Sequence, residues 1–186
     1  MKPSEYLRYD ATALADLIRR GEVTSREVTE AAIDRASAVN PRLNAICHPQ
    51  FAEAMDQGFS AEGPFAGVPL LLKDLAQEQA GHPCTYGSRA LLKNVATRDS
   101  QFVRRAREAG LVFLGRTATP EFGLKAVTES ALWGPSRNPW DTERTPGGVP
   151  FIDPKDLTGA ALFLASDDCR AMHGATLLVD EGWAAW

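Results

Sequence analysis

The sequence predicts an α/β protein whose sheet is covered by helices. Two stretches are typical of buried strands: Gly67–Leu75, an apolar run that contains Lys73, and Leu111–Gly115, which is short and continuously apolar. Between them, Phe102, Val103 and Ala106 have the spacing of one helix face. Strand, helix and strand in this order favour parallel pairing, with both faces of the sheet covered.

Two helices are predicted before the first of these strands. One covers residues 12–20 and stops at Gly21. The second begins at Thr24, where Glu27 completes a capping box, and Asn40-Pro41 is expected to end it. The segments predicted next are a brief strand at 44–47, a helical segment near 50–57 and a turn-rich connector at 58–63.

Turn residues separate the later elements. A helical turn is predicted at residues 88–92, and Asp99 is expected to cap the helix that Gly110 ends. Residues 118–148 are rich in Gly and Pro, and a loop of this length in a compact domain usually has a function.

The carboxy-terminal part has a different character. Asp153-Pro154 predicts a helix start, with an acceptor cap followed by proline at the first helical position. Residues 157–165 are apolar almost all round, so this helix is expected to need cover on more than one side. A strand is predicted at residues 176–180.

Composition excludes several classes of protein. The 186 residues are 44% hydrophobic and 24% charged, which is typical of one globular domain or two small ones. A net charge of −4 lacks the basic footprint of a nucleic-acid binder. No signal peptide or membrane span is recognised, so we expect a cytoplasmic protein with neither nucleic acid nor membrane as a partner.

The three cysteines, Cys47, Cys84 and Cys169, lie far apart in the sequence and form no Cys-x-x-Cys pair. We expect reduced thiols. His48 follows Cys47, but a metal site needs three or four converging ligands, so neither a metal nor another cofactor is expected.

Lys73 is the leading candidate for chemistry, because it follows three leucines. If the fold holds this amine inside, loss of hydration favours its neutral form, which can act as a base near neutral pH. The alternative is a lysine at a strand end that forms an ion pair with Asp74.

Three stretches together resemble the amidase signature family: Gly63–Asp74, residues 96–100 through Gly115–Gly123, and Trp133–Trp140 to Thr145–Gly148. The resemblance covers residues 5–148 and implies a partial, truncated amidase-type mixed sheet over residues 1–148. It implies a C–N amide hydrolase acting on a small-molecule amide through a Ser-Ser-Lys triad, with Lys73 as the lysine. Glu121, Phe122, Gly123, Gly147 and Gly148 are then expected to line the substrate pocket.

The family's pattern breaks at Val149. This residue stands where the bridging serine is expected, and no Gly/Ser-rich segment follows to supply the nucleophile or oxyanion donors. Losing the nucleophile of a triad costs about as much as losing all its members, on the order of a millionfold. We therefore expect the chain to be inactive alone.

Residues 149–186 are similar to another family. Asp156–Asp167 and Gly174–Trp183 resemble the last helix and strand of short-chain dehydrogenases, although Glu181 stands where that family usually has glycine. The Tyr-x-x-x-Lys pair and the Gly-rich turn of that family are absent from the sequence. We interpret the chain as a junction near residues 148–153 of a partial amidase domain and a dehydrogenase-like helix-strand tail.

Several alternatives stay open. If the resemblance of the tail indicates the function, the chain could be a fragment of an oxidoreductase. It could also be a non-catalytic module that self-associates through the apolar tail. Phe122 could be a core residue and Gly123 a turn, and residues 85–88 could cap a helix. The candidates for a substitute nucleophile are Ser88, Ser130 and Ser136.

Overall fold

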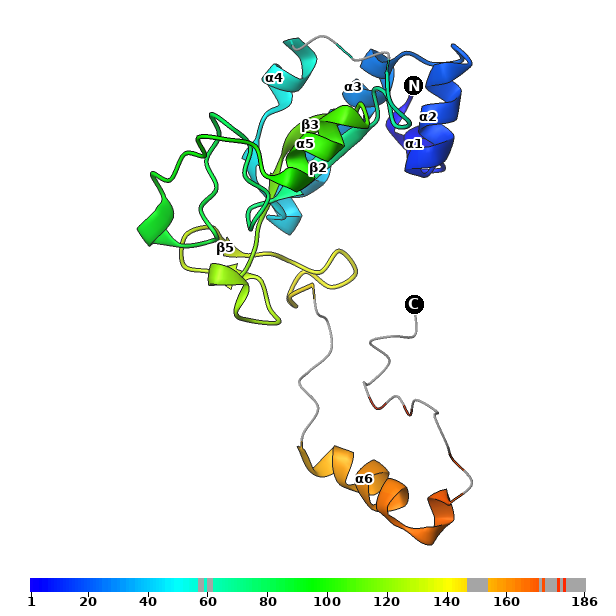
Figure 1. Ribbon diagram of the computed structural model, residues 1–186, viewed down its shortest axis with the longest axis vertical. Helices are drawn as coiled ribbons and strands as arrows, with labels where there is room; N and C mark the ends of the chain where they lie inside the picture. The colour runs from blue at the N-terminus through cyan, green and yellow to red at the C-terminus, as the bar shows by residue number, and fades with distance from the viewer. Residues whose placement is uncertain are drawn as a thin grey trace. The chain divides into compact units, whose positions relative to one another are not determined.

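The computed structural model describes residues 1–56, 59, 62–146, 154–170, 172, 177 and 179. The chain divides into two compact units, Met1–Gly147 and Gly148–Trp186, and each is described by itself. The described helices of the first unit are α1 (Pro3–Tyr6), α2 (Ala11–Arg19), α3 (Ser25–Leu43), α4 (Phe51–Asp56), α5 (Gln101–Glu108) and the 3-10 turns η1 (Arg89–Leu91) and η2 (Glu121–Gly123). Its described strands are β1 (Ile46–Pro49), β2 (Pro69–Lys73), β3 (Val112–Thr117), β4 (Glu129–Ser130) and β5 (Gly134–Pro135) (Figure 1).

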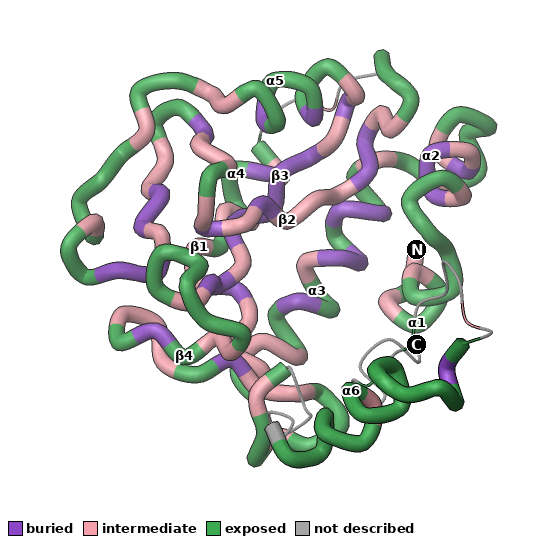
Figure 2. The backbone as a smooth tube through the Cα atoms, turned by 60° about the horizontal axis from the view of Figure 1, so that its bottom comes forward, coloured by how far each residue is buried: buried purple, intermediate pink, exposed green. Residues whose placement is uncertain are grey.

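The sheet of the first unit is mixed, which confirms the predicted α/β class. Its strand order is β1-β3-β2, with β2 parallel and β1 antiparallel to β3. One apolar cluster joins Leu72 and Phe113 of the sheet to Val103 of α5. Another joins Leu114 of β3 to Ala32 of α3 and to α4. Burial therefore concentrates along β3 and the facing side of α3 (Figure 2).

The beginning of α3 follows the prediction, whereas its end does not. Thr24 and Glu27 form the expected capping box. The helix continues through Pro41 to Leu43, because the Asn40 side chain accepts hydrogen bonds from the amides of Ala45 and Ile46 and stabilises the turn beyond the proline. Asn44, with a left-handed φ of 49°, ends the helix.

The predicted cap of α5 was wrong by one residue. Ser100, and not Asp99, accepts the hydrogen bond from the amide of Val103. The Asp99 carboxylate instead accepts from the Ala80 amide and from Arg107. Asp99 thereby ties the loop after β2 to α5.

Gly115 allows β1 to approach β3 closely. Its φ is +135°, and a Cβ at this position would lie 2.2 Å from the carbonyl oxygen of His48 on β1. The pairing of β1 with β3 is irregular between Ile46 and His48. The end of the sheet that carries Cys47, His48 and Lys73 therefore depends on a glycine.

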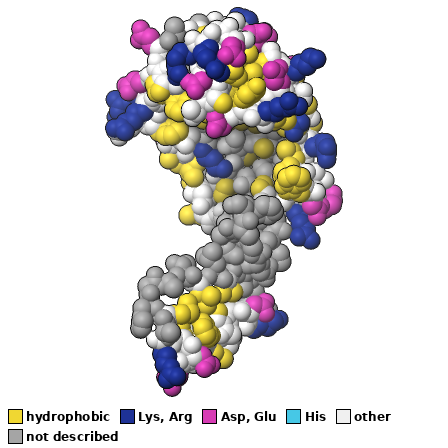
Figure 3. Space-filling model, turned by 90° about the vertical axis from the view of Figure 1, so that its right-hand side faces the viewer, with side chains coloured by type: hydrophobic (Ala, Val, Ile, Leu, Met, Phe, Trp, Pro, Cys, Tyr) yellow, Lys and Arg dark blue, Asp and Glu magenta, His cyan; other side chains and the backbone are white. Residues whose placement is uncertain are grey.

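The second unit contains the 3-10 turn η3 (Pro154–Leu157), the helix α6 (Thr158–Ala165) and the turn η4 (Asp167–Cys169). Apolar side chains gather on its surface (Figure 3), and Leu162 and Leu164 are 65% and 52% exposed. Asp153 and most of the strand predicted at 176–180 lie outside the described residues. Within the described part of the chain, no helix is long and apolar enough to cross a membrane.

Candidate active site

Lys73 ends β2 at the carboxyl edge of the parallel strand pair. Its side chain is half-buried, and Nζ donates a hydrogen bond to the carbonyl oxygen of Ala118 at 2.8 Å. Its backbone amide donates to Oε1 of Gln77 at 2.6 Å. The amine is therefore directed toward the segment that follows β3.

Asp74 does not pair with Lys73 among the described ion pairs, so the strand-end alternative was wrong in that respect. The Asp74 carboxylate is fully buried and accepts hydrogen bonds from the Thr85 amide, at 2.7 Å, and from the Thr85 hydroxyl. The Gly87 amide lies 3.4 Å from the same carboxylate. Asp74 thus anchors the loop at residues 85–88, where Ser88 also caps η1 as predicted.

Arg116 on β3 is also fully buried, and its role was not predicted from the sequence. Its Nη1 donates to the carbonyl oxygens of Lys73 and Gln77, at 3.0 and 2.8 Å. Nε and Nη2 have no partner among the described residues. The guanidinium therefore fixes the backbone on which Lys73 stands, and the available signal was a charged residue in an otherwise apolar strand.

Trp133 lies in the long loop after β3 and contacts Thr85 and His48. Its indole nitrogen lies 3.3 Å from Oγ1 of Thr85, to which it donates. Its ring meets the His48 ring edge-on, with centroids 4.7 Å apart. The loop at residues 118–148, for which the sequence predicts a function, therefore contacts Thr85, which binds Asp74, and His48 on β1.

The three candidate serines are engaged elsewhere. Ser88 donates to Glu121 at 2.6 Å, and Ser136 donates to the carbonyl oxygen of Asn44 at 2.8 Å. Ser130 accepts from the Trp133 amide at 3.1 Å. None of them hydrogen-bonds to the Lys73 amine in the described part of the chain.

The segment Glu121–Gly123 lies beside the loop that follows Lys73. The Phe122 amide donates to the carbonyl oxygen of Tyr86, and a Cβ on Gly123 would lie 2.8 Å from the Leu75 side chain. Phe122 is 45% exposed with a φ of 53°, so the alternative of a core residue was wrong. Gly123 does lie in a turn, as the same alternative expected. Gly147 and Gly148 are outside the described residues.

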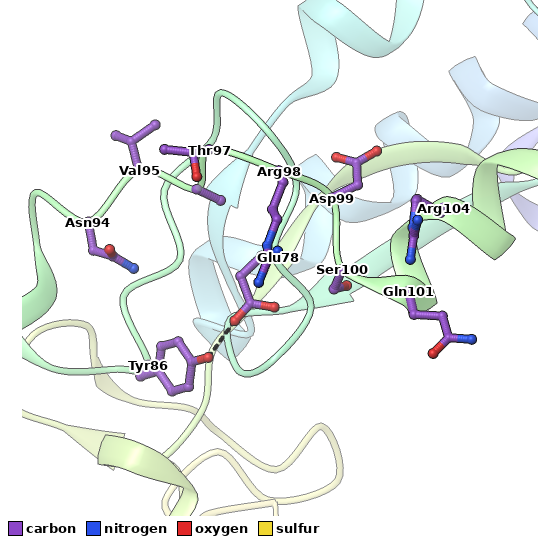
Figure 4. A pocket seen from close by; sticks show the side chains of 11 residues that line it. Glu78, Tyr86, Asn94, Val95, Thr97, Arg98, Asp99, Ser100, Gln101 and Arg104 are labelled. Atoms are coloured by element: carbon purple, nitrogen blue, oxygen red, sulfur yellow. Dashed lines mark hydrogen bonds between the residues drawn. The ribbon is translucent and has the colours of Figure 1, made fainter.

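A cavity of about 840 Å³ lies next to this region, lined by Glu78 and Tyr86, by residues 94–101 and by Arg104 (Figure 4). The Tyr86 hydroxyl donates to Glu78 inside it. This hydrogen bond, assisted by burial, raises the pKa of Tyr86 to about 12, and it lowers the pKa of Glu78. Lys73 is not among the residues that line the cavity.

Fold and site define a class: a mixed α/β unit that presents a lysine amine from the end of a parallel strand. The model of the Amidase family matches residues 27–149. The chain is 45% identical over 141 residues to the 6-aminohexanoate-cyclic-dimer hydrolase of Paenarthrobacter ureafaciens, covering 75% of this chain and 29% of the relative.

Two solved structures are similar to the first unit. That of a 6-aminohexanoate cyclic dimer hydrolase with substrate superposes with a TM-score of 0.70 at 45% identity, over 74% of this chain and 29% of that chain. That of the native peptide amidase from Stenotrophomonas maltophilia superposes with a TM-score of 0.65 at 32% identity, over 76% and 32%. The chain belongs to the amidase family, and it spans less than a third of the length of these relatives.

Proposed function

We propose that this chain is the lysine-bearing, amino-terminal part of an amidase-type C–N hydrolase, and that it does not hydrolyse amides by itself. The observation that carries the proposal is the position of Lys73. Its amine is held at the edge of the sheet by the carbonyl oxygen of Ala118, and no serine hydroxyl of the described residues bonds to it.

The chemistry explains the expected inactivity. The amine of Lys73 can accept a proton only from a hydroxyl within hydrogen-bond reach, and it then activates that oxygen for attack. Val149 offers no hydroxyl at the position of the bridging serine. Without a bridging serine and a nucleophilic serine, a base at Lys73 cannot cleave the C–N bond.

The same proposal assigns the parts of the chain. Residues 1–148 form a partial amidase domain, whose pocket wall includes Glu121–Gly123, Gly147 and Gly148, and a small amide is its substrate class. Residues 149–186 form a tail of short-chain-dehydrogenase type. The three cysteines of the described residues are free, which fits the reducing conditions of the cytoplasm.

A serine-hydrolase probe tests the proposal. The purified chain is incubated with a fluorophosphonate and with a chromogenic small amide, beside the variants Lys73→Met and Ser88→Ala. We expect neither labelling nor hydrolysis in any of the three proteins. Stoichiometric labelling that disappears in Lys73→Met would overturn the inactivity, and its loss in Ser88→Ala would identify the nucleophile.

Self-association through α6 is a second proposed property, supported by the exposure of Leu162 and Leu164 within the second unit. Light scattering after size exclusion measures the mass of the chain and of the variant Leu162→Glu/Leu164→Glu. We expect the unmodified chain to exceed its monomer mass of 20.2 kDa and the variant to match it. A monomeric unmodified chain would contradict the proposal.

A further inference from the structure

Three side chains of different donor type converge below the sheet edge. The thiol sulfur of Cys47, a ring nitrogen of His48 and a carboxylate oxygen of Asp74 all lie within 4.8 Å of one another. Thiolate, imidazole and carboxylate together are a donor set for zinc. We propose that Cys47, His48 and Asp74 form a binding site for Zn²⁺, with a fourth coordination position left to solvent or a small anion.

The convergence depends on an irregularity of β1. Successive residues of a regular strand point to opposite faces of the sheet, so Cys47 and His48 would normally diverge. The register of β1 against β3 shifts between Ile46 and His48, and such a bulge re-aims one side chain. Asp74, which directly follows β2, then completes the set from the other side of β3.

Each of the three donors has capacity for a metal. Nε2 of His48 is buried and has no hydrogen-bond partner among the described residues, and the Trp133 ring meets the imidazole edge-on. The Cys47 thiol donates a weak hydrogen bond, at 3.5 Å, to the carbonyl oxygen of Arg116. A carboxylate offers about four lone-pair sites, and the Asp74 carboxylate accepts three hydrogen bonds.

The geometry requires only a small adjustment. Zinc bound at 2.0–2.3 Å in a tetrahedral site places its ligand atoms about 3.3–3.8 Å apart. The separation between donors must therefore shrink by at most about 1.5 Å, divided between two side chains. A rotation of the half-buried Cys47 and His48 side chains supplies this, while Asp74 stays fixed by Thr85.

The charges around the three donors limit which ions the site can bind. Cys47 binds the metal as a thiolate, so the thiol proton passes to solvent when the ion binds. The buried Arg116 guanidinium adds a positive charge nearby, which an anion or hydroxide at the fourth position would offset. The site is therefore expected to take one divalent ion of high thiolate affinity and to reject Mg²⁺ and Ca²⁺.

Cobalt is the probe, because Co²⁺ bound by a thiolate gives a near-ultraviolet charge-transfer band. Zn²⁺ gives no such band, so it abolishes the absorption when it displaces Co²⁺. The full chain is titrated with Co²⁺ beside the variants Cys47→Ser, His48→Ala, Cys84→Ser and Cys169→Ser. We expect one saturable band per chain, its loss in Cys47→Ser and at least about tenfold weaker binding in His48→Ala. Cys84→Ser and Cys169→Ser should leave the band unchanged, and circular dichroism shows that each variant is folded.

An alkylation experiment gives a second readout that is independent of colour. Iodoacetamide labelling of each cysteine is followed by mass spectrometry with and without Zn²⁺. We expect Zn²⁺ to protect Cys47, with no change at Cys169. A missing cobalt band, a band that survives in Cys47→Ser, or unprotected Cys47 would each overturn the site. None of these results depends on whether the chain hydrolyses an amide.

Discussion

Removal of the Asp74 carboxylate is the sharpest test of the polar network under Lys73. In Asp74→Ala, the amide and hydroxyl of Thr85 both lose their acceptor in a fully buried environment. Hydrogen bonds to a charged group contribute about 1.5–3 kcal/mol each, so the variant should lose about 3–6 kcal/mol of its free energy of unfolding. Asp74→Asn keeps one carbonyl oxygen for the Thr85 amide and should lose only about 1–2 kcal/mol.

The free energy of unfolding is measured by urea titration, followed by circular dichroism. An unchanged slope with denaturant shows that the midpoint reports stability. Asp16→Ala is the matched control, because Asp16 forms an exposed ion pair with Arg19 and should cost less than about 1 kcal/mol. The reasoning is refuted if Asp74→Ala costs no more than this control, or if Asp74→Asn costs as much as Asp74→Ala.

Three further predictions concern the backbone and two titrating groups. Gly115→Ala should lower the free energy of unfolding, measured in a thermal melt, by about 3 kcal/mol or more, because the new Cβ would meet the His48 carbonyl. Gly21→Ala, with open space around it, is the control and should cost about 1 kcal/mol, so equal losses would contradict the prediction. Hydrogen bonds from Thr24 lower the pKa of Glu27 below 4.5, so the stabilisation by its carboxylate is present above pH 4.5 and is lost as the pH falls through the lowered pKa. Glu27→Gln should therefore reduce the loss of stability in acid, measured by urea unfolding at several pH values. An unchanged loss in this variant would contradict the prediction. Glu78→Gln should bring the pKa of Tyr86 from about 12 back toward 10.0 in an ultraviolet titration, and a pKa that stays near 12 would show that Glu78 is not the cause.

Local patterns predicted the elements whose partners are close in sequence. The capping box of α3 and the parallel pairing of β2 with β3 follow from spacing and residue type. The face predicted for α5 is correct for Val103 and Ala106, which are buried, and wrong for Phe102, which is 48% exposed. The end of α3 could not be predicted, because the Asn40 side chain satisfies amides beyond the proline. Asp99 and Ser100 are both good caps, and only the fold shows that Ala80 and Arg107 occupy the former.

The candidate site divides in the same way. Lys73 was identified because the motif around it is contiguous, whereas Arg116 acts through carbonyl oxygens that lie far away in the sequence. Regular alternation along a strand would direct Cys47 and His48 to opposite faces, and a register shift in β1 brings them together. Asp74 looked like an ion-pair partner for its neighbour, yet its carboxylate faces Thr85 instead.

Lys73 and Asp74 are adjacent in the chain but direct their side chains to different partners, so the two proposals can be separated by substitution. Lys73→Met removes the amine that is proposed to act as the base and leaves the donors of the proposed zinc site in place. Cys47→Ser removes a metal donor and leaves the bond between Lys73 and Ala118 intact. A change at Asp74 should disturb both, because its carboxylate is a proposed ligand and also anchors the loop beside the amine. If Asp74→Asn weakens cobalt binding while Lys73→Met does not, the buried network serves the metal independently of the lysine.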